Sequence, residues 1–184
     1  MGYCSLPAGR AWFGNICGDA EASGSLKMQS TRSPSTLVVM QALRDAAATQ
    51  AFGRQLALRL PAGSILLLAG DLGAGKTCLV QGLAAGLGIE EPITSPTFAL
   101  AQHYPLPKGG GLVHLDLYRL ELPAAADELF AQEEEEARSL GALLAVEWPE
   151  RLSSAPAGCW QIQLSLSDPF NPEAGRLIEV RSPS

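Results

Sequence analysis

One octapeptide constrains the fold of this chain more than any other feature of its sequence. Residues 70–77 read Gly-Asp-Leu-Gly-Ala-Gly-Lys-Thr and match the pattern G-x-x-x-x-G-K-S/T. The preceding apolar run, 64–69, is typical of a buried parallel strand, and the following residues form a helical apolar stripe that stops at Gly88. Glycines allow such a loop to turn its backbone N–H groups inward, where they and the helix N-terminus attract an anion. The octapeptide therefore predicts a phosphate-binding loop between a strand and a helix.

The residue types in this loop indicate separate roles. In this motif the lysine, Lys76, reaches the β- and γ-phosphates of a nucleotide, and the hydroxyl of Thr77 ligates Mg²⁺. Lys76 is also one of only three lysines in the chain, which favours a retained role over a random surface charge. A turn needed only for chain reversal is the alternative, and the flanking pattern argues against it. The expected nucleotide site consists of Gly70, Asp71, Leu72, Gly73, Ala74, Gly75, Lys76, Thr77 and Cys78.

Two acidic residues are candidates for holding the metal and orienting the attacking water. Asp116 closes the apolar run 112–116, and Glu147 follows the apolar run 141–146. Phosphoryl chemistry places such acids at the carboxyl ends of strands beside the phosphate loop. Each acid could instead be a solvated charge at a strand end, as most acidic residues are. The occurrence of both together favours function.

A polar turn and an aromatic residue extend the set of candidates. Thr97 lies in a turn that a γ-phosphate could order as a switch, although a plain turn explains the residue equally well. Trp148 directly follows Glu147, so the indole could lie at the mouth of the site or pack in the core. The histidines His103 and His114 fit structural or surface roles better than those of metal ligands or bases.

The remaining patterns predict an α/β fold of the P-loop NTPase type, with a mostly parallel central sheet flanked by helices. Apolar runs predict strands near 37–40, 64–69, 99–104, 112–116 and 141–146, and helical patterns cover 46–60 and 124–137. The alternating segments 159–166 and 176–181 predict an antiparallel hairpin added to one edge of the sheet. The acidic run 133–136 is typical of a solvated helix face.

Domain organisation follows from composition along the chain. Residues 1–36 are rich in Gly, Ser and Ala without a sustained period, and we expect them to form a flexible N-terminal extension. Residues 37–184 then form one domain, since 184 residues with 47% hydrophobic content support one substantial core.

Charge and cysteine content exclude several classes of protein. A net charge of −6 disfavours direct binding of nucleic acid, which depends on lysines and arginines that neutralise phosphates. The four cysteines are far apart and form no C-x-x-C pair, so neither a zinc site nor a disulfide framework is expected, and a reducing cytoplasm is the simplest location. Apolar runs are far shorter than the about 20 residues of a membrane-spanning helix, so no membrane association is expected.

Four motifs in series resemble those of a known family. They are the octapeptide at 70–77, Ser-Pro-Thr-Phe at 95–98, His-Leu-Asp-Leu-Tyr-Arg-Leu at 114–120 and Val-Glu-Trp-Pro at 146–149. Together they closely resemble the bacterial TsaE (YjeE) family over about residues 37–181. The resemblance implies a small ATPase that works with TsaB and TsaD in forming N6-threonylcarbamoyladenosine in tRNA. It implies contact with tRNA only through those partners.

The resemblance also implies roles for individual residues. The loop would hold ATP, Thr77 and Glu147 would ligate Mg²⁺, and Asp116 would act with Lys76 in catalysis as the Walker-B or water-orienting acid. Thr97 would lie in a switch segment. The chain departs from the common family pattern at Cys78, where a second Thr or Ser often follows the loop. One further nucleotide contact is carried over, Thr49 toward the base. Trp148 is expected as a nucleotide contact at the mouth of the site because it directly follows Glu147.

Two other functions remain compatible with these residues. A small-molecule kinase also uses a phosphate-binding loop, but it needs a lid with arginines, and Arg119, Arg138 and Arg151 do not cluster in one insert. A nucleotide-gated scaffold would bind ATP without useful hydrolysis. Hydrolysis measured with and without TsaB and TsaD, together with a screen for phosphorylated metabolites, separates the three.

Overall fold

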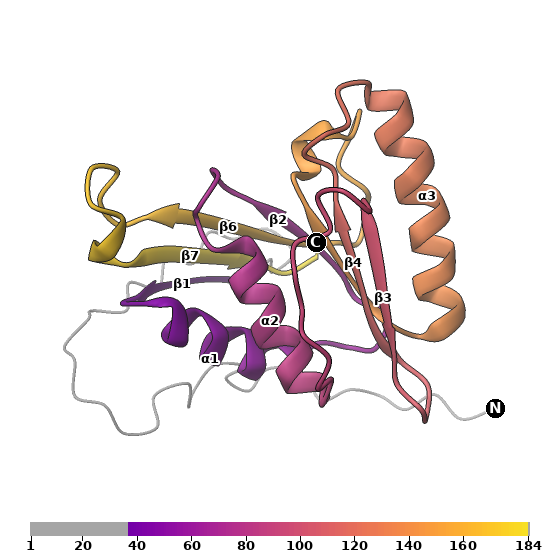
Figure 1. Cartoon of the computed structure of the whole chain (residues 1–184), viewed down its shortest axis with the longest axis horizontal. Coiled ribbons are helices and arrows are strands. Elements are labelled where there is room, and N and C mark those ends of the chain that lie inside the picture. Colours follow the sequence, from indigo (N-terminus) through magenta and orange to yellow (C-terminus); the bar gives the residue numbers. More distant parts are fainter. Residues whose placement is uncertain (1–36, 184) are drawn as a thin grey trace.

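The computed structural model describes residues 37–183, so the predicted extension at 1–36 lies outside the described residues. Strands and helices alternate through most of this part of the chain (Figure 1). The strands are β1 (Val38–Leu43), β2 (Ile65–Ala69), β3 (Ala101–Pro105), β4 (Gly111–Asp116), β5 (Leu143–Glu147), β6 (Trp160–Leu166) and β7 (Arg176–Arg181). The helices are α1 (Ala46–Ala57), α2 (Lys76–Leu87) and α3 (Pro123–Leu140), with short 3-10 turns at Pro149–Arg151 and Pro172–Ala174.

All seven strands form one sheet in the order β1-β7-β6-β2-β5-β4-β3. The central neighbours pair in parallel, β6 with β2, β2 with β5 and β5 with β4. The outer neighbours pair antiparallel, β1 with β7, β7 with β6 and β4 with β3. The mixed α/β prediction is therefore confirmed, but the sheet is parallel only in its centre.

The C-terminal hairpin is confirmed and its expected position is wrong. β6 and β7 pair antiparallel from Gln161 opposite Arg181 to Leu166 opposite Arg176. However, β6 lies against the central strand β2, and β7 is covered by β1, which forms the edge. The pairing of β1 with β7 joins segments more than 130 residues apart, and no local pattern in the sequence reports such a pairing.

The helices cover opposite faces of the sheet. One apolar cluster joins α1 and α2 to β6, β7 and alternate residues of the central strands, among them Leu66, Leu68 and Ile162. A second cluster joins α3 to the residues in between, such as Leu67, Val113 and Val146. Figure 1 shows α1 and α2 together on one side and α3 on the other. Strands β2, β4 and β5 are buried on both faces, as their continuous apolar runs predict.

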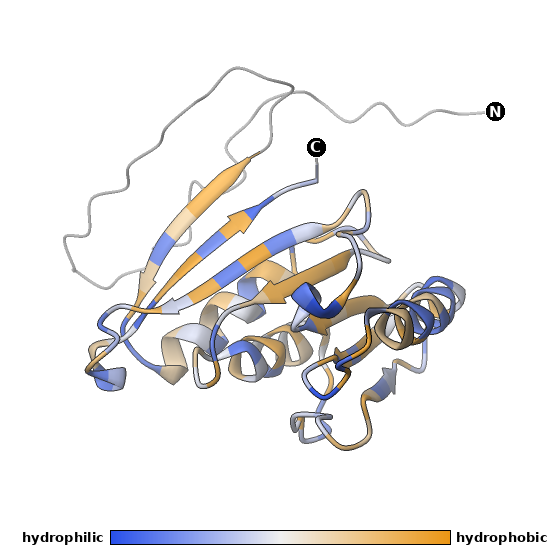
Figure 2. Ribbon diagram, turned by 90° about the horizontal axis from the view of Figure 1, so that it is seen from above, coloured by the Kyte–Doolittle hydropathy of each residue, from blue (hydrophilic) through white to orange (hydrophobic). Residues whose placement is uncertain are grey.

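The outer strands have one buried and one open face. Burial alternates along β6, where Trp160, Ile162 and Leu164 face the helices and the glutamines between them are exposed. Figure 2 shows this alternation of hydrophilic and hydrophobic residues along the outer strands, with helices on one side of them. Period-two alternation is the pattern of a strand with one solvated face.

Helices α1 and α2 approach each other at backbone distance. A Cβ atom added to Gly82 would lie 2.2 Å from the carbonyl oxygen of Gln50, and one added to Gly53 would lie 2.5 Å from that of Leu79. Gly86 has a similar contact, 2.6 Å from the carbonyl oxygen of Arg54. These three glycines therefore allow the backbones of α1 and α2 to lie in contact.

The acidic run on α3 differs from the expectation. Glu133 is buried, with 4% exposure, and its carboxylate lies 2.5 Å from Nε2 of His103 on β3. Helical spacing places position 133 on the same face as Phe130 and Ala137, which pack on the sheet. The prediction of a fully solvated run is wrong for this residue.

Among residues 37–183, no helix combines the length and apolarity needed to cross a bilayer.

Candidate functional site

The predicted phosphate-binding loop connects the carboxyl end of β2 to the start of α2. Gly70, Gly73 and Gly75 all have positive φ angles, 140°, 81° and 103°. At Gly70 a Cβ atom would lie 2.2 Å from the carbonyl oxygen of Leu164, so no larger residue fits there. Gly75 precedes α2 in a left-handed conformation, and no side chain caps the first turn. The N–H groups at this helix start are therefore left for another acceptor, as an anion site requires.

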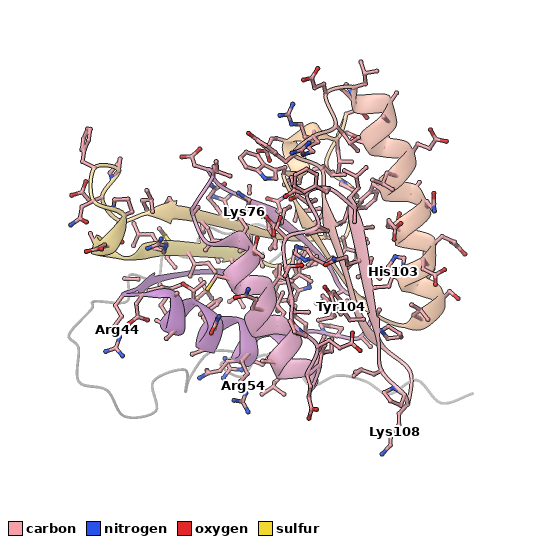
Figure 3. All side chains as sticks on the ribbon, viewed as in Figure 1. Arg44, Arg54, Lys76, His103, Tyr104 and Lys108 are labelled. Atoms are coloured by element: carbon pink, nitrogen blue, oxygen red, sulfur yellow. The ribbon has the colours of Figure 1, made fainter. Side chains whose placement is uncertain are left out.

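Lys76 is a buried cation at the start of α2, where Figure 3 labels it. Its Nζ donates hydrogen bonds to the carbonyl oxygens of Gly70, at 2.6 Å, and Asp71, at 3.0 Å. The Trp148 ring covers the ammonium, with Nζ 3.9 Å from the ring centroid. Burial lowers the pKa of Lys76, and the nearby carboxylate of Glu147 acts in the opposite direction. The loop thus holds a partly desolvated positive charge where phosphates are expected to bind.

Thr77 and Glu147 lie in contact, although 70 residues separate them. The Thr77 hydroxyl donates to Oε1 of Glu147 at 2.9 Å, and Nε2 of His114 lies 2.9 Å from the same oxygen. Glu147 is 3% exposed and His114 is fully buried. The structure therefore joins the two predicted metal ligands, and it adds a histidine that we had not expected at the site.

Asp116 lies opposite Glu147 in the register of β4 and β5. Its Oδ2 accepts hydrogen bonds from the hydroxyls of Ser95, at 3.0 Å, and Thr97, at 2.7 Å. Its Oδ1 accepts from the backbone N–H of Tyr118 at 2.9 Å. The expected switch segment is therefore tied to this acid, and Ser95 belongs to the contact although only Thr97 was a candidate.

The side chains of two predicted nucleotide contacts face other partners. Thr49 is 1% exposed, and its hydroxyl donates to the carbonyl oxygen of Asp45 one helical turn earlier. Its methyl group packs toward Gly75, where a Cβ atom would lie 3.9 Å away. The thiol of Cys78 donates to the carbonyl oxygen of Ala46, and burial raises its pKa. Contact of Thr49 with a nucleotide base stays a prediction.

Arg176, at the start of β7, is a site residue that sequence reasoning missed. Its guanidinium donates to the carbonyl oxygens of Pro172, at 2.6 Å, and Gly73, at 3.4 Å. Its Nε lies 3.8 Å from the position of a Cβ atom on Gly75. The hairpin β6–β7 thus brings a second positive charge to the loop. The only available signal was an arginine at the start of a C-terminal strand, which is too common to point to a site.

Thr77 and Glu147 supply the side-chain oxygens that could hold a metal ion at this site. Within residues 37–183, no group of three or more His, Cys, Asp or Glu side chains is arranged to hold a metal ion. Mg²⁺ commonly takes only one or two protein carboxylates, together with substrate phosphates and waters. The adjacent oxygens of Thr77 and Glu147, with Asp116 beside them, fit that requirement.

Comparisons with known proteins agree with the motifs. The family model described as threonylcarbamoyl adenosine biosynthesis protein TsaE matches residues 43–172. A Synechocystis protein named tRNA threonylcarbamoyladenosine biosynthesis protein TsaE is 52% identical over 118 residues, which cover 62% of this chain and 73% of the relative. A Nostoc protein of the same name is 42% identical over 141 residues, 75% of this chain and 82% of the relative.

A solved structure has a similar fold. The crystal structure of Bacillus subtilis YdiB superposes with a TM-score of 0.61 at 27% sequence identity, covering 83% of this chain and 90% of that chain.

Proposed function

This chain belongs to the TsaE family, and from that premise we propose that it binds and hydrolyses ATP with Mg²⁺ to support N6-threonylcarbamoyladenosine formation in tRNA. The proposed role is to drive turnover of a complex of TsaB and TsaD. Contact with tRNA occurs through those partners.

One observation carries the hydrolytic part of this proposal. At the start of α2, the Thr77 hydroxyl donates to the buried Glu147, and the carboxylates of Glu147 and of the buried Asp116 both act to raise the pKa of Lys76. These acids come from segments far from the loop in the sequence. Burying two carboxylates is costly unless cations or donors compensate them, and here the hydroxyls of Thr77, Ser95 and Thr97 donate to them. A merely structural turn would not need this arrangement.

Each residue of the site has a different role in phosphoryl transfer to water. Lys76 exchanges its two carbonyl acceptors for phosphate oxygens, while the N–H groups at the start of α2 bind the same anion. Thr77 and Glu147 would hold Mg²⁺, which would supply positive charge against the phosphates. Asp116 would orient the attacking water, whose oxygen bonds to the γ-phosphorus as the bond to the β,γ-bridging oxygen breaks and whose proton passes to the released phosphate. The Ser95 and Thr97 hydroxyls link this step to the switch segment.

The switch segment offers partners a means of sensing the nucleotide. Phe98, directly after Thr97, is 85% exposed, and the Arg119 guanidinium lies 4.1 Å from its ring centroid. A change at Asp116 moves Thr97 and with it this exposed aromatic residue. Such an ordering of a segment by phosphate contacts is a common way to signal nucleotide state.

Two of the arginines considered for a lid, Arg119 and Arg138, argue against the kinase alternative. Arg119 stacks on Phe98, and Arg138 pairs with Glu134 and Glu135 on the exposed side of α3. These arginines therefore do not converge over a common acceptor site. The scaffold alternative is left to experiment.

The test is phosphate release from ATP by the chain alone and with TsaB, TsaD and tRNA. We expect hydrolysis to rise with the partners, and Lys76→Ala, Asp116→Asn and Glu147→Gln each to lower it about a hundredfold or more. Glu135→Gln, an exposed acid on α3, is the matched control and keeps full activity. Circular dichroism checks that each variant is folded.

Three results would contradict the proposal. ATP binding without release of phosphate in any mixture would favour the scaffold. A phosphorylated metabolite accumulating in place of free phosphate would favour the kinase. Full hydrolysis by both acid variants would show that Asp116 and Glu147 are structural.

A further inference from the structure

The described residues contain two histidines in contrasting positions. His103 on β3 has a side chain that is 41% exposed and pairs with Glu133. His114 on β4 has a fully buried side chain and lies 2.9 Å from Oε1 of Glu147. Figure 3 labels His103 beside α3, away from Lys76. Only His114 therefore touches the candidate site.

Among the described residues, the His114 side chain has one hydrogen-bond partner, Glu147. Its Nδ1 is buried and has no hydrogen-bond partner among the described residues. An ionised carboxylate can only accept, so Nε2 is the nitrogen that carries the proton and donates to Glu147. A buried nitrogen without a partner destabilises a folded protein. Leu112, which lies on the same face of β4, is buried and apolar, so packing alone would be served by an apolar residue at 114.

The two donors define the orientation of Glu147. Both the Thr77 hydroxyl and the His114 ring point to Oε1, from α2 on one side and β4 on the other. A carboxylate held by two rigid donors has little freedom to rotate. Carboxylates and imidazoles hydrogen-bonded in this way hold metal ligands in place in many proteins.

We propose that His114 is a positioning residue, whose Nε2–H holds the Glu147 carboxylate in the orientation that binds the Mg²⁺ of the bound nucleotide. This inference rests on the proposed function, because it assigns a helper to the metal ligand named there. His114 itself contacts neither nucleotide nor metal.

The experiment measures metal binding apart from activity. ADP is bound to the protein, and the Mn²⁺ concentration that half-saturates the complex is read by electron paramagnetic resonance. ADP affinity in EDTA is measured in parallel. We expect His114→Phe, which keeps a ring without a donor, to raise the half-saturating Mn²⁺ concentration at least tenfold. ADP affinity in EDTA stays within twofold of the wild type.

Two amide variants distinguish the effect of the hydrogen bond to Glu147 from the effect of a polar side chain at position 114. In His114→Gln the side-chain nitrogen occupies a position like that of Nε2, so we expect Mn²⁺ binding within threefold of the wild type. In His114→Asn the amide is one methylene shorter and does not reach Glu147, so we expect the loss seen with Phe. His103→Phe is the matched control with unchanged Mn²⁺ binding. The Gln and Asn pair decides the question if the Phe variant is unfolded.

The failing outcomes are distinct. Equal Mn²⁺ binding by the Gln and Asn variants overturns the inference, as does a loss of ADP affinity in EDTA, which would show a general structural role. Wild-type protein that binds no ADP, or whose ADP complex takes up no Mn²⁺, instead contradicts the proposed function itself.

Discussion

At the scale of single residues, Trp148 has a strained backbone conformation and is also part of the candidate site. Among residues 37–183, only Leu100 and Trp148 are non-glycine residues with positive φ, 67° and 60°. Such a conformation costs about 1 kcal/mol or more. Leu100 ends the segment tied to Asp116, and Trp148 places its ring over Lys76 and against Tyr118, with 4.8 Å between the ring centroids. Both strained residues therefore flank the site.

The indole of Trp148 covers the Lys76 ammonium, with Nζ 3.9 Å from the ring centroid. Because burial is the largest cause that lowers the pKa of Lys76, we expect Trp148→Ala to raise that pKa toward the ordinary value of 10.5. Loss of the cation–π contact acts in the opposite direction, but water solvates an ammonium more strongly than an aromatic face does. The measurement is an NMR titration of ¹³C-methylated lysines.

The exposed Lys108 serves as the internal control and should titrate unchanged. A Lys76 pKa that stays the same or falls in the alanine variant would show that the indole does not exclude water from the ammonium.

At the scale of elements, the contact of α1 with α2 depends on glycine. Alanine is favoured over glycine within a helix by about 1 kcal/mol. At position 82, however, the new methyl group would meet the backbone of Gln50, and overpacking costs about 1–3 kcal/mol. We expect Gly82→Ala to lower the free energy of unfolding despite its better helix propensity, as measured by urea denaturation.

Ala85→Gly, at an exposed position of the same helix, calibrates propensity alone and should cost about 1 kcal/mol. If Gly82→Ala stabilised the protein by that amount, the two helices would not be in backbone contact.

The hairpin β6–β7 is expected to contribute to nucleotide binding through Arg176. Its guanidinium is anchored at Pro172 and reaches the loop at Gly73, so it adds positive charge beside the anion site. We expect Arg176→Gln to weaken ATP binding about tenfold, equivalent to about 1.4 kcal/mol. Isothermal titration calorimetry provides the measurement.

Arg181→Gln, at the other end of β7, removes an arginine that pairs with Glu179 and should leave ATP affinity unchanged. Equal affinities of both variants and the wild type would show that Arg176 only fastens the hairpin.

At the scale of the whole molecule, the negative net charge disfavours direct binding of nucleic acid. The chain carries a net charge of −6, and binding to tRNA depends on neutralising phosphates. We expect the isolated protein to bind labelled tRNA with a dissociation constant above about 1 μM at about 0.15 M salt, near physiological ionic strength. Filter binding measures this directly. Submicromolar binding by the protein alone would reveal a basic surface hidden in the linear sequence.

Local patterns were sufficient to predict most elements of this fold. The strand before the loop, the helix from Lys76 to Leu87 and its end at Gly88 follow from apolar periodicity and from glycine's access to positive φ. The roles proposed for the loop rest on a motif in which phosphate binding itself requires these residue types at this spacing. The strand, the helix and the helix end depend on residues close together in the chain, so the sequence alone determined them, while the roles of the loop stay a prediction.

Tertiary structure alone decided which distant segments meet. It paired β1 with β7, buried Glu133 against β3, and brought Arg176 to the loop. It also placed His114 on Glu147 and Ser95 on Asp116, which no motif spacing had indicated. A periodic pattern shows that one face of an element is buried but not what buries it. The partner of each side chain is determined by packing of the whole sheet, whose contacts join residues far apart in the sequence.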